Sequence, residues 1–175
     1  MSHIASGYRI RLAELSDLAQ LPAIEQAAAQ QFQATPYSFI ADLAPMSMSR
    51  LHQLWSAGKI WLVIDAMESP VGFAIIKFWD ELIYLHEIDV HPRHTCQGLG
   101  RALVETICDW GKLQNYQAVV LSTFQDIPWN GAFYAKCGFQ MIPQMELSPQ
   151  LQQVRAQEVM AGLPIQQRIC MRRHL

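Results

Sequence analysis

One stretch of this sequence, Ile88–Arg101, constrains the fold more than any other. The alternating apolar run Leu82–Val90 leads into it, and a polar turn with Gly98 and Gly100 follows. A strong helical pattern begins directly after these glycines, so the predicted order is strand, glycine turn, helix. Backbone N–H groups at such a helix N-terminus point towards whatever lies over the turn, and glycines let an anionic group come close. The simplest ligand for this turn is a phosphate or pyrophosphate.

Two common phosphate-binding motifs do not match this turn. A dinucleotide-binding fingerprint needs a third glycine three residues after the second, where this chain has Leu103. A P-loop needs Gly-Lys-Ser/Thr, whereas Gly100 is followed by Arg101 and Ala102. Because a bare Gly-x-Gly is more typical of a plain tight turn, the surrounding residues have to identify the ligand.

The residues around the turn resemble the GNAT superfamily of acyl-CoA N-acyltransferases. The hallmark of that superfamily is Gln/Arg-x-x-Gly-x-Gly/Ala, preceded by Val-x-Pro. Val90-His91-Pro92 and Gln97-Gly98-Leu99-Gly100-Arg101 match it, although the first hallmark position falls on Thr95. Tyr134-Ala-Lys-Cys-Gly-Phe139 is similar to the second signature, Tyr-x-x-x-Gly-Phe. The resemblance covers most of the chain, is strongest over Leu82–Phe139, and implies an acyl-CoA as the ligand.

Hydrophobic periodicity divides the chain into alternating strands and helices. The predicted strands are Tyr8–Leu12, Ile60–Asp65, Val71–Trp79, Leu82–Val90, Ala118–Thr123, Phe139–Ile142 and Arg168–Arg172. Helices are expected from a cap at Ser16-Asp17 (with Pro22 kinking it or splitting off its first turn), over Ser47–Ala57, from Leu99, over Trp129–Cys137, and from the Ser148 cap.

Hairpins make part of the predicted sheet antiparallel, and the helix crossover from Val90 to Ala118 makes part of it parallel. Together, these strands and helices predict one α/β domain over residues 1–175, with a mixed central sheet flanked by helices on both faces. The resemblance implies six or seven strands, with the central pair splaying apart to admit the pantetheine arm. Tyr37 and Phe39 lie in an aperiodic segment and are interpreted either as packing under a lid or as substrate contacts.

Composition excludes several classes of protein. Hydrophobic residues are 51% and charged residues 16%, as in a globular chain. The net charge is -2 with no basic run, which argues against nucleic acid and anionic membranes as partners. No apolar run is long enough to cross a bilayer, and the N-terminus lacks an apolar signal core. The four cysteines show no Cys-x-x-Cys pair, so they are interpreted as reduced thiols of a cytoplasmic protein without a zinc site.

The resemblance implies that the cofactor is held largely by backbone groups. The backbone of Ile88, Asp89 and Val90 would bind the pantetheine arm as a neighbouring strand would, and the turn would hold the pyrophosphate. Arg101 would add charge there, or it is a solvated helix residue. The implied cofactor-binding residues are Ile88, Asp89, Val90, Thr95, Cys96, Gln97, Gly98, Leu99, Gly100, Arg101, Asn130, Phe133 and Tyr134. Among these, Asn130 fits the family pattern less well, because the asparagine of many relatives lies further upstream.

Glu87 is the candidate base for the amine. It is a carboxylate on a strand that is otherwise mostly apolar, and desolvation raises the pKa of such a group, which suits a base. Asp89, which alternation places on the same face, and His86, on the opposite face, are rivals, as is a water chain. A salt-bridged or solvated Glu87 is the structural alternative.

Tyr134 is the candidate acid for the departing thiolate, because a phenol stays protonated at neutral pH. The sequence therefore predicts transfer of an acetyl group from acetyl-CoA to a primary amine, by direct attack and without a metal. The acidic residues Glu87 and Asp89, with Asp80 and Glu81, favour a cationic acceptor. Two alternatives stay open: a catalytically idle acyl-CoA-binding domain and O-acyl transfer. A homodimer is compatible with the sequence.

Overall fold

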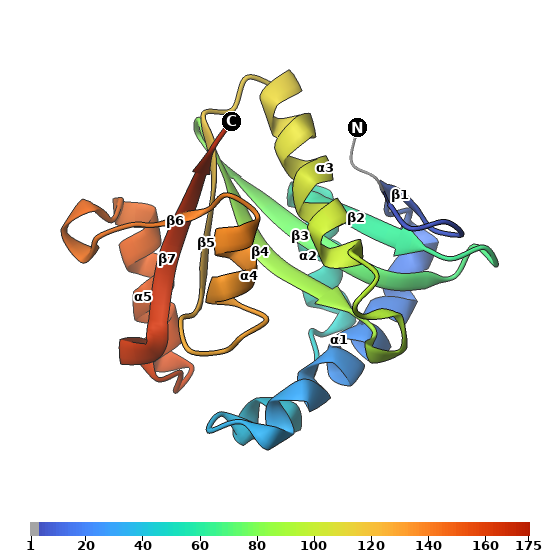
Figure 1. The fold of residues 1–175 in the computed structure, drawn as a ribbon, viewed down its shortest axis with the longest axis horizontal. Coiled ribbons are helices and arrows are strands. Elements are labelled where there is room, and N and C mark those ends of the chain that lie inside the picture. Colours follow the sequence, from blue (N-terminus) through green and yellow to red (C-terminus); the bar gives the residue numbers. More distant parts are fainter. Residues whose placement is uncertain (1–3) are drawn as a thin grey trace. The chain divides into compact units, whose positions relative to one another are not determined.

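A computed structural model describes residues 4–175, so the first three residues of the predicted domain 1–175 lie outside the described part. Seven strands form one open, mixed sheet flanked by helices, in the order β1-β2-β3-β4-β5-β7-β6 (Figure 1). The strands are β1 Arg9–Leu12, β2 Lys59–Ile64, β3 Pro70–Trp79, β4 Leu82–Val90, β5 Ala118–Phe124, β6 Gln140–Met141 and β7 Arg168–His174. All seven predicted strands are confirmed, and no end differs from its predicted position by more than two residues.

Five α-helices lie in the described chain: α1 Leu21–Ala29, α2 Met48–Ala57, α3 Leu99–Leu113, α4 Gly131–Lys136 and α5 Pro149–Met160. Ser148 caps α5 as predicted, and Ser47, predicted only as the start of a helix, caps α2. Each accepts a hydrogen bond from the backbone N–H three residues on. The predicted cap at Ser16-Asp17 is wrong. A 3-10 helix, η1 Leu15–Gln20, begins after Glu14, and α1 begins separately with Pro22 in its first turn, so this proline does split the segment.

The chain packs as two compact units, Met1–Lys77 with Leu85–Ile107, and Phe78–Tyr84 with Cys108–Leu175. The single domain expected for residues 1–175 stays a prediction. Strands β3 and β4 and helix α3 each contribute residues to both units. The units are described one at a time below.

In the first unit, strands β1, β2 and β3 are antiparallel, and β2 and β3 carry an apolar face covered by η1, α1 and α2. Alternation places Phe73 and Ile75 of β3 on that face, where both are fully buried. They pack in one hydrophobic core with Leu18, Leu21, Ile24, Leu51, Leu54, Ile60, Leu62 and Ile64. The later part of β4, Leu85–Val90, and the turn into α3 belong to the same unit.

In the second unit, β5 is the central strand, and its almost unbroken burial confirms the interpretation of an apolar strand covered on both faces. It pairs with β7 in antiparallel register over all seven residues and with the first three residues of β4 in parallel register. Helix α5 packs through Leu151 against a core of Tyr84, Val120, Ile142, Leu147 and Cys170. The buried pair Arg168–Glu158, with 2.5 Å between Nη2 and Oε1, joins β7 to α5.

Candidate active site

The predicted glycine turn, residues Thr95–Arg101, joins β4 to α3 through a short 3-10 helix, η4 Pro92–His94. Cys96 (φ 61°) and Gly98 (φ 74°) both adopt left-handed backbone, which favours glycine. A Cβ added to Gly98 would meet no protein atom within 4 Å, so the protein leaves space above the turn. This arrangement fits a ligand that approaches the backbone closely.

The first intrahelical hydrogen bond of α3 runs from the N–H of Ala102 to the carbonyl of Gly98, 2.9 Å. By helix geometry, the N–H groups of Leu99, Gly100 and Arg101 precede any intrahelical acceptor. These donors lie at the positive end of a 15-residue helix. The turn therefore has the donor set of an anion-binding site, with Arg101 exposed beside it.

Thr95 has a local structural role at the position where the hallmark has Gln or Arg. Its hydroxyl donates a hydrogen bond of 2.9 Å to the carbonyl of Pro92, which closes η4. The His94 N–H closes the same turn on the carbonyl of His91, 2.8 Å. The departure from the hallmark thus replaces a long polar side chain by one that stabilises the approach to the turn.

Gly72 of β3 supports β4 just ahead of the turn, and sequence reasoning missed it. A Cβ at this position would lie 2.9 Å from the carbonyl oxygen of Asp89 and 3.2 Å from a methyl group of Val90. The His91 N–H donates to the carbonyl of Val71, 2.8 Å. A glycine inside an apolar strand signals such a close backbone approach, so the sequence did carry this information.

The three ionisable residues of β4 differ in their surroundings. Glu87 is partly buried. Burial raises the pKa of the Asp89 carboxyl group well above its usual range, and the carboxylates of Glu87 and Glu25 raise it further. The Oδ2 atom of Asp89 is fully buried and has no hydrogen-bond partner, although the residue as a whole keeps some exposed surface. This buried oxygen is poorly placed to receive a proton from the amine that accepts the acetyl group.

His86 is a poor candidate base. Burial, together with the cations Lys77 and Arg50, lowers its pKa to about 3. A group with so low a pKa is neutral at physiological pH, but it binds a proton too weakly to compete for one from an ammonium group. Of the rivals considered from the sequence, His86 is therefore the weakest.

Three further charged residues of the first unit, Glu25, Lys77 and Arg50, act on the ionisable residues of β4, and sequence reasoning missed them. Glu25 of α1 is partly buried, burial raises its pKa, and its Oε2 accepts a hydrogen bond of 2.9 Å from the Met46 N–H. Lys77 of β3 has a pKa lowered by burial and by Arg50, while Glu87 opposes that shift. These residues come from α1, α2 and β3, so no local sequence pattern could have grouped them with β4.

Tyr134 lies in the second unit, on the short helix α4, and is only 7% exposed. Its ring makes T-shaped contacts with Phe133 and Phe139, with centroids 5.0 Å and 5.6 Å apart. Its N–H donates to the carbonyl of Asn130, 3.0 Å. The helix predicted from Trp129 begins only at Gly131, so Asn130 precedes α4 as its N-cap, with no capping hydrogen bond from its side chain.

The predicted residues thus fall into two sets. Glu87, Ile88, Asp89, Val90 and the glycine turn lie in the first unit, whereas Asn130, Phe133 and Tyr134 lie in the second. Of the two aromatic residues left open, Tyr37 is buried, which agrees with packing, and Phe39 is 39% exposed.

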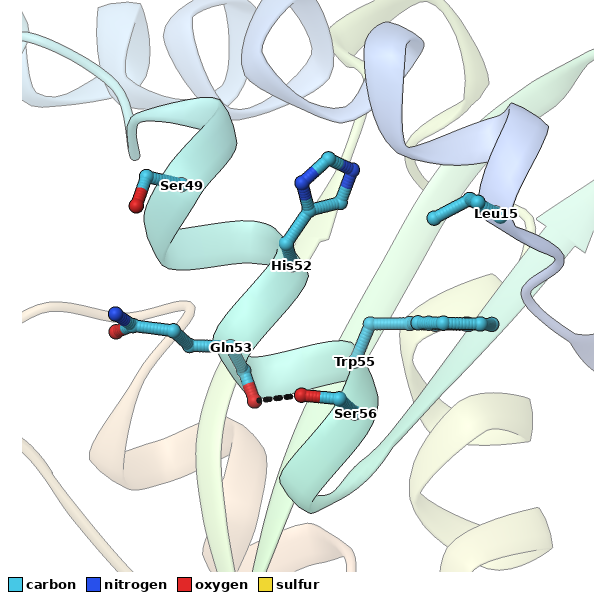
Figure 2. Close-up of a pocket in the computed structure, with 6 residues that line it drawn as sticks. All are labelled: Leu15, Ser49, His52, Gln53, Trp55 and Ser56. Carbon is cyan, nitrogen blue, oxygen red and sulfur yellow. Dashed lines mark hydrogen bonds between the residues drawn. The ribbon is translucent and has the colours of Figure 1, made fainter.

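A surface hollow of about 680 Å³ lies elsewhere in the first unit (Figure 2). It is lined by Leu15, Ser49, His52, Gln53, Trp55 and Ser56. None of the predicted site residues lines it, and the indole N–H of Trp55 is engaged by the carbonyl of Ala13, 3.0 Å. This hollow is a feature of the α2 surface and carries none of the expected chemistry.

Within residues 4–175, no group of three or more His, Cys, Asp or Glu side chains is arranged to hold a metal ion. Over the same residues, no helix has the length and apolar character needed to cross a membrane.

Comparison with known proteins assigns the chain to a family. A family model described as "Acetyltransferase (GNAT) family" matches residues 22–139. The fold is similar to PaiA N-acetyltransferase from Thermoplasma acidophilum in complex with coenzyme A, at 15% identity and a TM-score of 0.71, covering 96% of this chain and 99% of that one. It is also similar to a GNAT family acetyltransferase from Listeria monocytogenes, at 16% identity and a TM-score of 0.70, covering 99% of both chains.

A third similar structure is N-acetylglutamate synthase from Neisseria gonorrhoeae, complexed with coenzyme A and N-acetyl-glutamate. It is 17% identical with a TM-score of 0.68, and the match covers 96% of this chain and 35% of that one. At these identities the solved structures show a shared fold. The family model spans more than half of the sequence, and on that ground the chain belongs to the acetyltransferase (GNAT) family.

Proposed function

We propose that this protein is an N-acetyltransferase that moves an acetyl group from acetyl-CoA to a primary amine. The observation that carries the proposal is the left-handed turn at Cys96 and Gly98, open above and followed by the N-terminus of α3. It is joined by η4 to a strand, β4, that carries a partly buried carboxylate, Glu87. Coenzyme A in the structures of similar proteins supports this choice of ligand.

Residues Thr95–Arg101 would hold the pyrophosphate through backbone N–H groups, with the charge of Arg101 beside them. The backbone of Ile88, Asp89 and Val90 would bind the pantetheine arm, and Asn130 and Phe133 would add contacts from the second unit. The acceptor must reach the thioester as a neutral amine, because an ammonium group has no lone pair. Glu87 would therefore take a proton from the ammonium form.

The nitrogen lone pair then forms a bond to the thioester carbonyl carbon, giving a tetrahedral intermediate. When the intermediate collapses, the carbonyl bond re-forms, the C–S bond breaks and its electron pair leaves on sulfur, while the positively charged nitrogen loses its extra proton to solvent and becomes the neutral amide. Tyr134 would donate its phenolic proton to this thiolate. The products are the N-acetylated amine and free coenzyme A.

The charges around β4 support a cationic acceptor. Glu25 and Glu87 both raise the pKa of Asp89, so three carboxyl groups share one region of the first unit. A positively charged amine reduces the repulsion among carboxylates, whereas an anionic acceptor increases it. We place the reaction in the cytoplasm, because none of the four cysteines, which all lie in the described residues, forms a disulfide.

Thiol release from acetyl-CoA, measured with a panel of primary amines, tests the proposal. We expect turnover with cationic amines, and Glu87→Gln to lower kcat by about 10²–10⁴-fold. Asp89→Asn is the matched comparison, and a loss confined to that variant would make Asp89 the base. Binding of acetyl-CoA without turnover of any amine would favour an idle acyl-CoA-binding domain instead.

Tyr134→Phe keeps the ring and removes the proton. Because thiols already leave well, kcat should fall only on the order of tenfold to a hundredfold, with little change in acetyl-CoA affinity. Tyr116→Phe, a tyrosine of the same unit in the surface cluster with Phe78 and Trp110, is the control. Equal turnover of the Tyr134 variant and the parent protein would show that Tyr134 only packs and does not act as the acid.

A further inference from the structure

The segment between β4 and α3 is attached to other elements at two points by hydrogen bonds, within the described residues. The first is the backbone bond from His91 to Val71. The second is a side-chain hydrogen bond of 2.8 Å between the Tyr8 hydroxyl and Nδ1 of His94, 86 residues apart in the sequence. His94 precedes the glycine turn directly, so this second attachment holds the start of the turn.

Tyr8 is a firmly placed partner. Its N–H donates to the carbonyl of Ala5, 3.2 Å, and the next residue, Arg9, begins β1 in register with Ile64 of β2. The Tyr8 ring meets the His94 imidazole edge to face, with centroids 5.8 Å apart and planes at 90°. The hydroxyl therefore approaches His94 from the residue that directly precedes β1, a strand of the sheet.

The turn needs such support because of its backbone. Cys96, two residues after His94, carries a side chain in left-handed conformation, and such a residue persists only when its surroundings hold it there. On its far side the turn runs into α3, where Leu99 is buried. On its near side the Tyr8–His94 hydrogen bond supplies the corresponding constraint.

We propose that Tyr8 and His94 are positioning residues for acetyl-CoA, because their hydrogen bond holds the glycine turn in the shape that presents its N–H groups to the pyrophosphate. This inference rests on the proposed function, in which residues Thr95–Arg101 bind that group. Neither side chain takes part in the chemistry. The hydrogen bond acts on the affinity for acetyl-CoA and leaves the chemical step unchanged.

Tyr8→Phe removes only the hydroxyl. We expect the KM and Kd for acetyl-CoA to rise roughly three- to tenfold, the equilibrium effect of one hydrogen bond, with kcat unchanged. His94→Ala should give the same increase. The double variant should be no weaker than either single variant, because both remove the same interaction. His94→Asn, whose side-chain oxygen lies near the position of Nδ1, should restore most of the affinity.

Arg9→Gln is the matched control, since Arg9 follows Tyr8 but makes its ion pair with Glu68 and has no hydrogen bond to the turn. An unchanged KM in Tyr8→Phe, or a lower kcat at constant KM, overturns the positioning role. If Tyr8→Phe is too unstable to assay, failure of His94→Asn to bind better than His94→Ala overturns it equally.

Failure of the underlying site is distinguished by Gly98→Val, which forces a β-branched residue into left-handed backbone. Gly162→Val is its control, because Gly162 has a similar φ of 77° and equally open space at the end of α5. Loss of binding in Gly98→Val alone supports the glycine turn as the site. Normal acetyl-CoA binding by Gly98→Val overturns both the site and the positioning role. If Gly98→Val loses binding but Tyr8→Phe binds acetyl-CoA normally, only the positioning role is overturned.

Discussion

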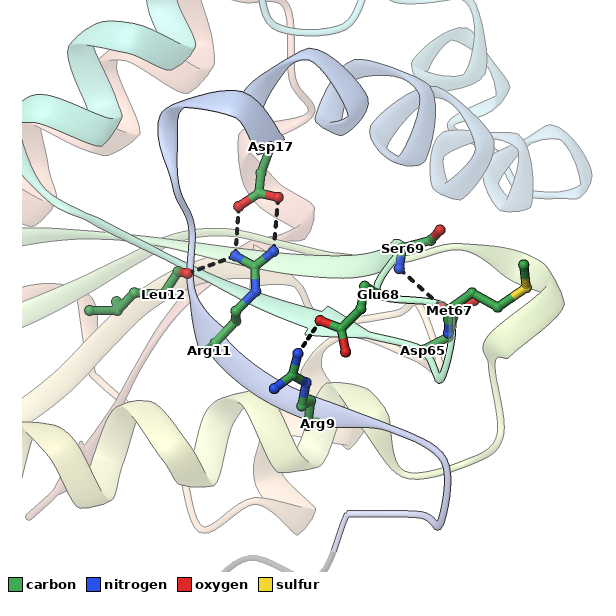
Figure 3. Close-up of polar contacts among 8 residues, drawn as sticks. All are labelled: Arg9, Arg11, Leu12, Asp17, Asp65, Met67, Glu68 and Ser69. Atoms are coloured by element: carbon green, nitrogen blue, oxygen red, sulfur yellow. Dashed lines mark hydrogen bonds and ion pairs between the residues drawn. The ribbon is translucent and has the colours of Figure 1, made fainter.

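Two aspartates of the first unit are both buried at their carboxyl groups but have opposite surroundings. Asp17, in η1, is held by the Arg11 guanidinium through hydrogen bonds of 2.6 Å and 2.9 Å (Figure 3). It also accepts a hydrogen bond of 2.7 Å from the Glu14 N–H. These hydrogen bonds, Arg11 first, lower the pKa of Asp17 against the opposing effect of burial. The carboxylate therefore stabilises the junction between β1 and η1.

Asp89 has no such partners. Its Oδ2 is buried without a hydrogen bond, and burial, then Glu87 and Glu25, raise its pKa. A buried unsatisfied carboxyl costs folding free energy rather than contributing to it. The comparison shows that the same residue type serves stability where its charge is paired and detracts from it on β4. Groups left unpaired at such a cost are typical of functional sites.

The largest effect on stability is expected from breaking the satisfied pair. Arg11→Met leaves Asp17 buried with one backbone donor, and we expect the free energy of unfolding to fall by about 3 kcal/mol at pH 7, measured by urea denaturation. The lowered pKa of Asp17 contributes stability above its unfolded value of 3.8, which is lost as the pH falls through the folded value. The variant should therefore lose less stability on acidification than the parent. A cost below about 1 kcal/mol would contradict the structural role of this pair.

A smaller effect of opposite sign is expected at Asp89. Because its folded pKa is raised, the folded state binds the proton more tightly, and stability declines as the pH rises from 3.8 through the folded pKa. Asp89→Asn removes the charge, so it should match the parent near pH 4 and exceed it by about 1 kcal/mol at alkaline pH. Thermal unfolding at a series of pH values measures this. Asp89→Asn being less stable than the parent throughout would show that a partner satisfies the carboxylate.

The smallest effect is expected at the exposed pair Arg9–Glu68, whose side chains are 59% and 61% accessible. Arg9→Met should change the free energy of unfolding by no more than about 0.5 kcal/mol, because solvent and salt screen this pair. Arg9 lies on the same strand as Arg11, two residues away, so the two variants differ in the burial and pairing of the arginine more than in its location. Similar losses for Arg9→Met and Arg11→Met would show that burial does not decide the strength of these pairs.

Much of this arrangement could be predicted residue by residue, where the signal is local. Pro22 predicted the split of the first helical segment, because a proline cannot donate to the preceding helical turn. The strand, turn and helix around Gly98 could be predicted, because left-handed backbone favours glycine and so marks the turn between the two elements. The cap at Glu14 was missed, because Glu is a less common cap than Ser or Asp, which follow at Ser16 and Asp17. The Glu14 N–H in turn donates a hydrogen bond to the Asp17 carboxylate, which was not predicted.

The surroundings of β4 could not be predicted in the same way. Glu25, Lys77 and Arg50 lie on three elements distant in sequence, and their electrostatic effect on Asp89 and His86 depends on how those elements pack. The Tyr8–His94 hydrogen bond likewise joins residues 86 positions apart. No periodicity or motif connects such pairs.

The sequence by itself determined the order of elements, the mixed sheet, the family and the position of the glycine turn. These depend on hydrophobic period, on caps and on backbone conformation, all of which are properties of neighbouring residues. Only the tertiary structure decided which carboxyl groups of the first unit are satisfied, which histidine is kept neutral, and what holds the turn in place. The reason is that desolvation and charge–charge interactions depend on distance in space, and folding brings together residues that the sequence keeps apart.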